Sequence, residues 1–149
     1  MKKPLKIKLF LGAALLVTLG ALSRVAAPGN VAQTATNHAD PKLRTRRYQV
    51  SQQDIAPKIE QLVPTLRTYG RAWKVKSSRT QNNITTVVCE VPVLFFTDDL
   101  IVTIRGEKDA SVIDAHSSSR VGKSDMGENR RHVLQLLNQT DKKFSRTSQ

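Results

Sequence analysis

The spacing of apolar positions along the chain predicts two amphipathic helices separated by a block of strands. The apolar stripe of the first helix, at intervals of mostly three or four residues, is formed by Ile55, Ile59, Leu62, Val63 and Leu66. Pro57 and Pro64 interrupt this stripe. Because each proline removes a backbone donor, we expect the helix to be kinked or split.

The second helix follows a loop that is rich in hydroxyl groups, glycine and basic side chains. Its apolar stripe consists of Met126, Val133, Leu136 and Leu137. Asp125 lies three residues before Glu128, which is the spacing of a capping box. We therefore expect this helix to begin at Ser124 or Asp125.

Between the two helices, the sequence has the pattern of β-strands. Apolar and polar residues alternate over residues 73–78 and 100–105, and residues 84–91 form a β-branched, mostly uncharged run. Another strand is predicted over residues 112–116. Pro92 predicts a break or a bulge, because proline cannot donate to a strand ladder.

A short strand over residues 48–50 precedes the first helix, so the predicted order is strand, helix, three or four strands, helix. The short connections between the strands favour antiparallel hairpins. We therefore predict an α+β fold, with a small antiparallel sheet of four to five strands and two helices packed on one face. Trp73 and Cys89 are expected to lie in its core.

The first residues of the chain resemble an export signal. Four basic residues, Lys2, Lys3, Lys6 and Lys8, precede the uncharged run of residues 9–22. This run is short for a membrane-spanning helix, which needs about 20 apolar residues. We predict a signal peptide over residues 1–23 with cleavage after Ser23, and the alternative is an uncleaved anchor.

The remainder of the chain divides by composition. Residues 24–43 are rich in Ala, Asn, Thr, Gly and Pro without periodicity, so we predict a flexible linker. Residues 44–140 are assigned to a single α+β domain, and the polar residues 141–149 to a disordered tail.

The positive charge of the chain restricts its partners. The formal net charge is +12, and removal of the four leader lysines, with no acidic residue, leaves +8. Such a charge favours an anionic ligand, an anionic protein or contact with a membrane surface, for which the arginines of residues 44–47 are candidates. Nucleic acid is not expected, because the protein is predicted to be exported and no stacking aromatic residues lie among its basic ones.

The densest group of ligand-binding side chains is in residues 117–131, where a basic loop meets the start of the second helix. A helix start presents free N–H groups and a partial positive charge, which can hold an anion. The candidate anion-binding residues are Ser119, Arg120, Lys123, Ser124, Asn129, Arg130 and Arg131. The alternative is a structural role, in which Asp98, Asp99 and Asp125 satisfy the arginines and the helix start.

The same segment resembles the sequence signature of a bacterial family known as domain of unknown function 1499. The matching residues are Ser117, Ser119, Arg120, Gly122, Ser124, Asp125, Gly127 and Asn129. The segments at residues 96–99 and 73–75 also resemble the family, and the resemblance spans roughly residues 46–137. His116 and His132 stand where the family usually has arginine. The resemblance supports the fold and implies no activity.

Other groups of reactive side chains have simpler explanations. Asp98 and Asp99 are adjacent on a strand and should point to opposite faces, so no metal site is predicted. Asp114 and His116 share a strand face and could form an acid–base pair, but a solvent-facing pair is the simpler expectation. The only cysteine cannot form an intrachain disulfide, and we predict no cofactor.

Three functions remain compatible with the sequence. The first is an exported, non-enzymatic domain that binds an anionic ligand or partner through the basic strand-to-helix corner. The second is a hydrolase-like enzyme that acts on an anionic substrate. The third is a structural protein of the envelope, held to the membrane by residues 1–23. We expect the protein to be exported to the periplasm or thylakoid lumen of a bacterium.

Overall fold

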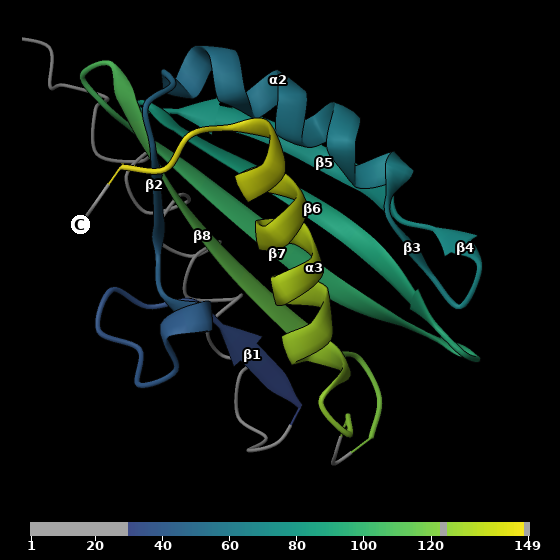
Figure 1. The fold of residues 1–149 in the computed structure, drawn as a ribbon. Coiled ribbons are helices and arrows are strands. Elements are labelled where there is room, and N and C mark those ends of the chain that lie inside the picture. The colour runs from purple at the N-terminus through teal and green to yellow at the C-terminus, as the bar shows by residue number, and fades with distance from the viewer. Residues whose placement is uncertain (1–29, 123–124, 148–149) are drawn as a thin grey trace, which may run out of the picture.

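The protein is an α+β domain in which one mainly antiparallel sheet carries two helices (Figure 1). The structure is a computed structural model, and it describes residues 30–122 and 125–147. Its elements are β1 (Val31–Gln33), η1 (Pro41–Leu43), β2 (Arg46–Tyr48), α2 (Gln52–Leu62), η2 (Val63–Thr65), β3 (Arg67–Thr68), β4 (Arg71–Ala72), β5 (Lys74–Gln81), β6 (Ile84–Val93), β7 (Phe96–Glu107), β8 (Ala110–Ser119) and α3 (Glu128–Lys143).

The main sheet has six strands, which is more than the four to five predicted. Its order is β1-β8-β7-β6-β5, and β2 also pairs with β8. β1 pairs with residues near the end of β8 and β2 with residues near its start, so two short strands share one edge (Figure 1). β3 and β4 form a separate two-stranded hairpin. The extra strands contain only two or three residues, too few for a periodic pattern to reveal them.

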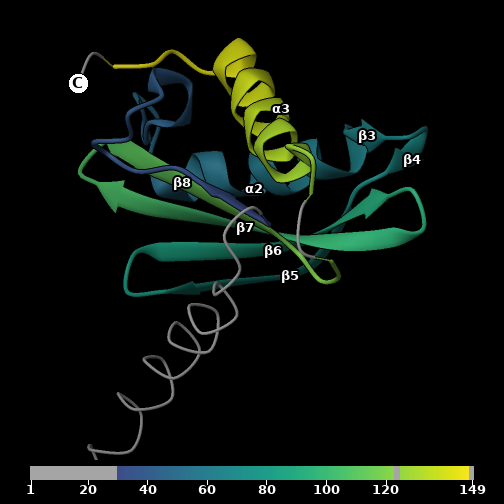
Figure 2. The same cartoon turned by 90° about the horizontal axis from the view of Figure 1, so that it is seen from below.

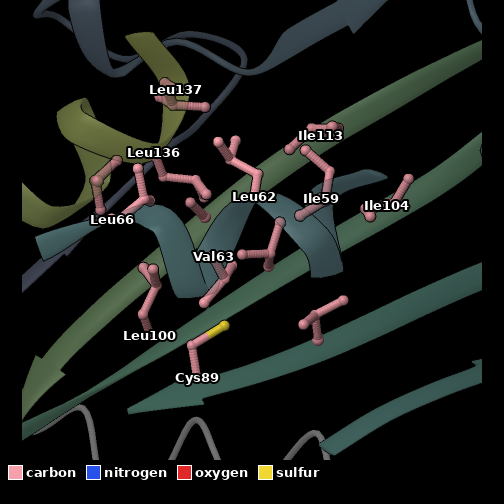
Figure 3. Close-up of a cluster of buried hydrophobic side chains, with 14 of the residues drawn as sticks. Ile59, Leu62, Val63, Leu66, Cys89, Leu100, Ile104, Ile113, Leu136 and Leu137 are labelled. Atoms are coloured by element: carbon pink, nitrogen blue, oxygen red, sulfur yellow. The ribbon is translucent and has the colours of Figure 1, made fainter. Parts of the chain in front are cut away.

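Both helices lie on the same face of the sheet, as predicted (Figure 2). The alternation of β7 turns Leu100, Val102 and Ile104 toward the helices, and each is completely buried. Side chains of α2 and α3 pack onto this row (Figure 3). Trp73 and Cys89 are also buried, and burial raises the pKa of the Cys89 thiol to about 12.

The prediction of a flexible linker over residues 24–43 is wrong for the part that the structure describes. Val31–Gln33 forms β1 and pairs with β8, and Pro41–Leu43 forms η1, which places Leu43 in the core. Sequence periodicity missed these elements because β1 gains its hydrogen bonds from a strand that lies about 85 residues later in the chain.

The predicted disordered tail over residues 141–149 also needs correction. α3 extends to Lys143, the ring of Phe144 packs edge-on against Tyr48, and Asp141 accepts a hydrogen bond of 2.7 Å from the Tyr48 hydroxyl. The backbone N–H of Thr147 donates to the carbonyl of Arg47. These contacts join the end of the chain to β2, so the domain includes its described C-terminal residues.

The predicted first helix is split at one of its two prolines, as expected. Pro57 lies inside α2, whereas α2 ends at Leu62 and the residues around Pro64 form the separate 3-10 helix η2. Pro92 causes no break in β6, and it pairs with Thr97 of β7. On the other side of β6, the pairing with β5 ends at Glu90 and Lys74, so Pro92 lies beyond the end of β5. At this unpaired margin a missing N–H is tolerated.

The start of α3 differs from the prediction by several residues. The helix begins at Glu128, and the residue before it, Gly127, has a left-handed conformation with φ of 82°. Met126 also has a positive φ and is 86% exposed, so it does not belong to the apolar stripe of the helix. Among the described residues, no helix is long and apolar enough to span a membrane.

Candidate functional site

The segment that joins β8 to α3 is fixed by a buried polar cluster centred on Asn129. The Asn129 side chain is completely buried and accepts a hydrogen bond of 2.6 Å from the Ser117 hydroxyl. Its amide nitrogen donates to the backbone carbonyl of Asn30 and to the hydroxyl of Ser119, both at 2.8 Å. One side chain of α3 therefore joins the end of β8 to the segment before β1.

Two further contacts hold the connecting loop. The Asn30 side chain donates to the backbone carbonyl of Gly122. Asp125 accepts hydrogen bonds of 2.9 Å from the backbone N–H groups of Gly127 and Asn129. Burial opposes ionisation of Asp125, but these N–H groups outweigh it and lower the pKa of its carboxyl. Asp125 thus occupies the place at the helix start where a bound anion was predicted.

Asp98 and His132 face each other in the interior beside this cluster. Asp98 Oδ2 lies 3.6 Å from Nδ1 of His132, and the two residues are only 3% and 1% exposed. Burial raises the pKa of Asp98 to about 6 and lowers that of His132 to about 4. Both groups are therefore neutral between these two values. His132 also packs edge-on against the indole of Trp73.

Asp99, the neighbour of Asp98, lies on the opposite face of the sheet, as the strand alternation predicted. It forms an ion pair of 2.6 Å with Arg120, whose Nη2 also lies 2.9 Å from Glu90. Arg120 is the largest influence on Glu90 and lowers the pKa of its carboxyl. Arg120 thus clamps β8 to β7 and β6 on the face away from the helices.

The other two arginines of the segment point to different partners. Arg130 pairs with Asp40, which caps η1, at 2.6 Å. Arg131 pairs with Glu128 at 2.5 Å, and the Tyr69 hydroxyl donates to the same carboxylate. The predicted anion-binding residues are therefore not brought together around one point. Lys123 and Ser124 lie outside the described residues.

Large apolar side chains gather on the surface around these ion pairs. We call this region the loop end: it comprises the β3–β4 turn at residues 69–70, the β6–β7 turn with the first residue of β7 at residues 94–96, and the β8–α3 loop at residues 120–122 and 125–127 (right and bottom in Figure 1). Its exposed apolar residues are Tyr69, Leu94, Phe95, Phe96, Val121 and Met126. Phe95 is 93% exposed.

Hydrogen bonds and strand register place the three parts of the loop end beside one another. Asp98 at the start of β7 pairs with Ser119 at the end of β8, so the β6–β7 turn and the β8–α3 loop lie at the same end of the sheet. Arg71 of β4 donates to the carbonyl of Leu94. Tyr69 reaches Glu128 at the start of α3.

The buried cluster contains a serine, a histidine and carboxylates, but its geometry does not support nucleophilic catalysis. Ser117 Oγ lies 3.4 Å from His132 Nδ1, yet it donates its proton to Asn129 and is completely buried. A nucleophile must reach its substrate. Within the described residues, two hollows lie along α2, one reaching Phe144 and the other Thr85.

The alternative acid–base pair is also separated by its contacts. Asp114 accepts hydrogen bonds from Thr34 and Thr45 and forms an ion pair with Arg105. In the described part of the chain, the ring nitrogens of His116 have no hydrogen-bond partner. A search of the described residues for clusters of three or more metal-ligating side chains finds none.

Comparison with known families agrees with the resemblance of the loop segment. A family model with the description "Protein of unknown function (DUF1499)" matches residues 22–139, most of the chain. The chain belongs to the DUF1499 family. No curated protein and no solved structure matches the chain. Membership in DUF1499 brings no activity with it.

Several residues that contact the β8–α3 segment of this DUF1499 protein were missed by sequence reasoning. Asn30 and Asp40 lay within residues 24–43, for which a linker was predicted, and Tyr69 was not singled out. His132 was noted only as a departure from the family signature, whereas it is buried against Asp98. The available signal for its burial was its position beside Val133 and four residues before Leu136, on the apolar face of the helix.

Proposed function

We propose that this DUF1499 protein is an exported, non-enzymatic domain that binds an anionic partner at its loop end. The observation that carries the proposal is that arginine side chains lie next to exposed apolar residues there. Arg71 contacts the backbone of Leu94, Arg120 precedes Val121, and Arg131 shares Glu128 with Tyr69. Exposed apolar residues edged by guanidinium groups are typical of a binding surface.

The charges at the loop end support an anionic partner, although each arginine already has a protein contact. Arg120 and Arg131 are 37% and 58% exposed in their side chains, so a ligand can reach them without opening the fold. Their carboxylate partners fix their directions and remove part of their charge. The +8 charge that remains without the leader adds a longer-range attraction to anions.

The buried position of the reactive groups supports a non-enzymatic role. Asp98 and Asp99 lie on opposite faces of β7, and Ser117 and His132 are enclosed by the domain. An enzyme would need at least two such groups to converge on an accessible site. Export is part of the proposal because of the leader-like residues 1–23, which lie outside the described residues.

Thermal unfolding in the presence of soluble anions tests the proposal. The full-length protein would be titrated at low salt with sulfate, inorganic phosphate, citrate and monomeric dihexanoyl-phosphatidylglycerol. We expect at least one probe to raise the melting temperature, because a ligand that binds only the folded state stabilises it. The effect should shrink at high salt.

Matched arginine variants locate the binding. Arg71→Ala and Arg120→Ala should each weaken the stabilisation, whereas Arg79→Ala, which removes an exposed arginine of β5 away from the loop end, should leave it unchanged. Absence of stabilisation by every probe would refute the proposal. Equal loss in Arg79→Ala would show a general charge effect and would also refute it.

A further inference from the structure

The exposed apolar side chains of the chain are concentrated at one end of the sheet. The large hydrophobic residues that are exposed in the described part are Tyr69, Ile84, Leu94, Phe95, Phe96, Val121 and Met126, and six of these seven belong to the loop end. Ile84 alone lies at the other end, and at 38% it is the least exposed. Such a concentration marks an interaction surface.

The turns at the two ends of the sheet differ in the residues that occupy their strained positions. At the opposite end these positions are polar: Asn82, Asn83 and Lys108 have positive φ values of 50°, 60° and 52°. At the loop end, Tyr69, Leu94 and Met126 have φ values of 51°, 46° and 50°. Residues other than glycine and asparagine rarely adopt this region. The non-glycine residues at positive φ are thus polar at one end of the sheet and large and mainly apolar at the other.

The shape of the loop end fits a soft, extended surface. Phe95 is at the tip of a hairpin, and Val121 and Met126 lie on a separate loop, so the apolar side chains project from turns and do not line a groove. A protein partner would have to supply a matching hollow for each tip. A lipid bilayer accepts separate apolar tips without a matching shape.

The basic residues beside the tips are placed for anionic headgroups. Arg71 contacts the Leu94 backbone at the β6–β7 turn, and Lys74 and Lys76 are exposed on the first residues of β5. Lys76 Nζ lies 3.4 Å from Glu90, the residue that Arg120 also contacts. Long basic side chains near an apolar tip reach the headgroup level while the tip enters the acyl region.

We infer that the loop end docks on an anionic lipid bilayer, with Leu94, Phe95 and Phe96 entering the interface and Arg71 and Arg120 contacting lipid phosphates. This inference rests on the proposed function and specifies the anionic partner. The contact is peripheral: it uses the turns of the folded domain and is separate from any role of residues 1–23.

A fluorescent probe at the hairpin tip tests the inference. Phe95→Cys would be labelled with an environment-sensitive nitrobenzoxadiazole group in the full-length protein, because Cys89 is buried and its pKa is raised to about 12, so it should not react. The matched control is Asp109→Cys, labelled in the same way at the exposed β7–β8 turn of the opposite end. Both proteins carry the same residues 1–29, so any tethering by the leader affects both.

With phosphatidylglycerol vesicles, we expect the Phe95→Cys probe to shift its emission to the blue and to become protected from iodide, while the Asp109→Cys probe remains unchanged. Arg71→Ala in the labelled protein should raise the lipid concentration at half-maximal response about fivefold. Phosphatidylcholine vesicles should give a much weaker response.

Three outcomes would overturn the inference: no response of the tip probe, an equal response of the two probes, or an equal response to the two lipids. If the tip probe fails to respond while soluble anions still stabilise the protein through Arg71 and Arg120, the bilayer is not the partner and the proposed function survives. If neither experiment gives a signal, both proposals fall.

Discussion

Two layers of polar side chains within residues 117–132 differ in burial although they come from the same short segment. The inner layer contains Ser117, Asn129 and His132, which are at most 1% exposed. The outer layer contains Arg120 and Arg131, which form ion pairs at the surface. Strand alternation and helix periodicity separate them, since successive residues face opposite sides on a strand and point about 100° apart around a helix.

This difference separates two roles that the sequence signature combines. Leaving a buried polar group without its partner lowers the stability of the fold by the full desolvation penalty of that group. An exposed ion pair stabilises the fold little, because each charge is well hydrated without its partner. We therefore assign the inner layer to stability, and the outer layer is the part that the proposed binding would use. The adjacent residues Asp98 and Asp99 show the same division within one dipeptide.

The largest effect is expected for Asn129→Ala. The variant leaves the Ser117 hydroxyl and the Asn30 carbonyl without their buried partner, which should lower the free energy of unfolding by about 3 to 4 kcal/mol. Chemical denaturation of the full-length protein measures this value. Asn138→Ala, at an exposed position of the same helix, is the control and should change it by less than about 0.5 kcal/mol. A similar small change in Asn129→Ala would contradict the assignment of the inner layer.

The next largest expected effect is on the pH dependence of the free energy of unfolding, to which Asp98 and His132 contribute. The native pKa of Asp98, about 6, lies above its reference value of 3.8, so this group makes the native state less stable as pH rises from about 4 to about 6. The native pKa of His132, about 4, lies below its reference value of 6.5, so this group makes the native state less stable as pH falls through that range. The two contributions oppose each other in the wild type.

Replacing one of the two residues should reveal the pH dependence of stability that the other contributes. The free energy of unfolding of Asp98→Asn minus that of the wild type should rise by up to about 3 kcal/mol between pH 4 and pH 7. For His132→Gln, the corresponding difference should fall by a similar amount over the same range. Denaturation curves at several pH values measure both differences. Curves that shift in the same direction for the two variants would show that the groups do not titrate as the burial implies.

A smaller effect is expected from the outer layer. Arg120→Ala should lower the free energy of unfolding by less than about 1 kcal/mol, because the ion pair with Asp99 is exposed to solvent and competes with hydration. A double-mutant cycle with Asp99→Ala at low and high salt measures the coupling, which should decrease with salt. A loss as large as that of Asn129→Ala would place Arg120 among the structural residues instead.

The smallest effect on stability is expected for Phe95→Ser. The side chain is 93% exposed, so the substitution should change the free energy of unfolding by no more than about 0.5 kcal/mol. The same variant should lose affinity for phosphatidylglycerol vesicles in a sedimentation assay. A marked destabilisation would mean that the tip contributes to the fold, and its exposure would then carry no argument for binding.

The helical stripes and strand alternation were sufficient to predict the α+β class and the two helices on one face. Leu100, Val102 and Ile104 follow the alternation that predicts a buried strand face, and all three are buried. The short strand β1 was not predicted, and the strand predicted over residues 48–50 is found as β2 at Arg46–Tyr48, because the hydrogen bonds of both come from β8 and not from local sequence. The predicted linker and tail include residues that belong to the folded domain, in β1 and at the end of α3.

The sequence by itself determined the family, the basic charge and the alternation that separates Asp98 from Asp99, since each of these is a property of local residue order. Only the tertiary structure decided which polar groups are buried, which arginine meets which carboxylate, and that three distant turns bring their apolar residues to one end of the sheet. These features depend on contacts such as those of Asn129 with Asn30 and of Tyr69 with Glu128. Such contacts join residues far apart in the chain, and they form only when the strands and helices pack together.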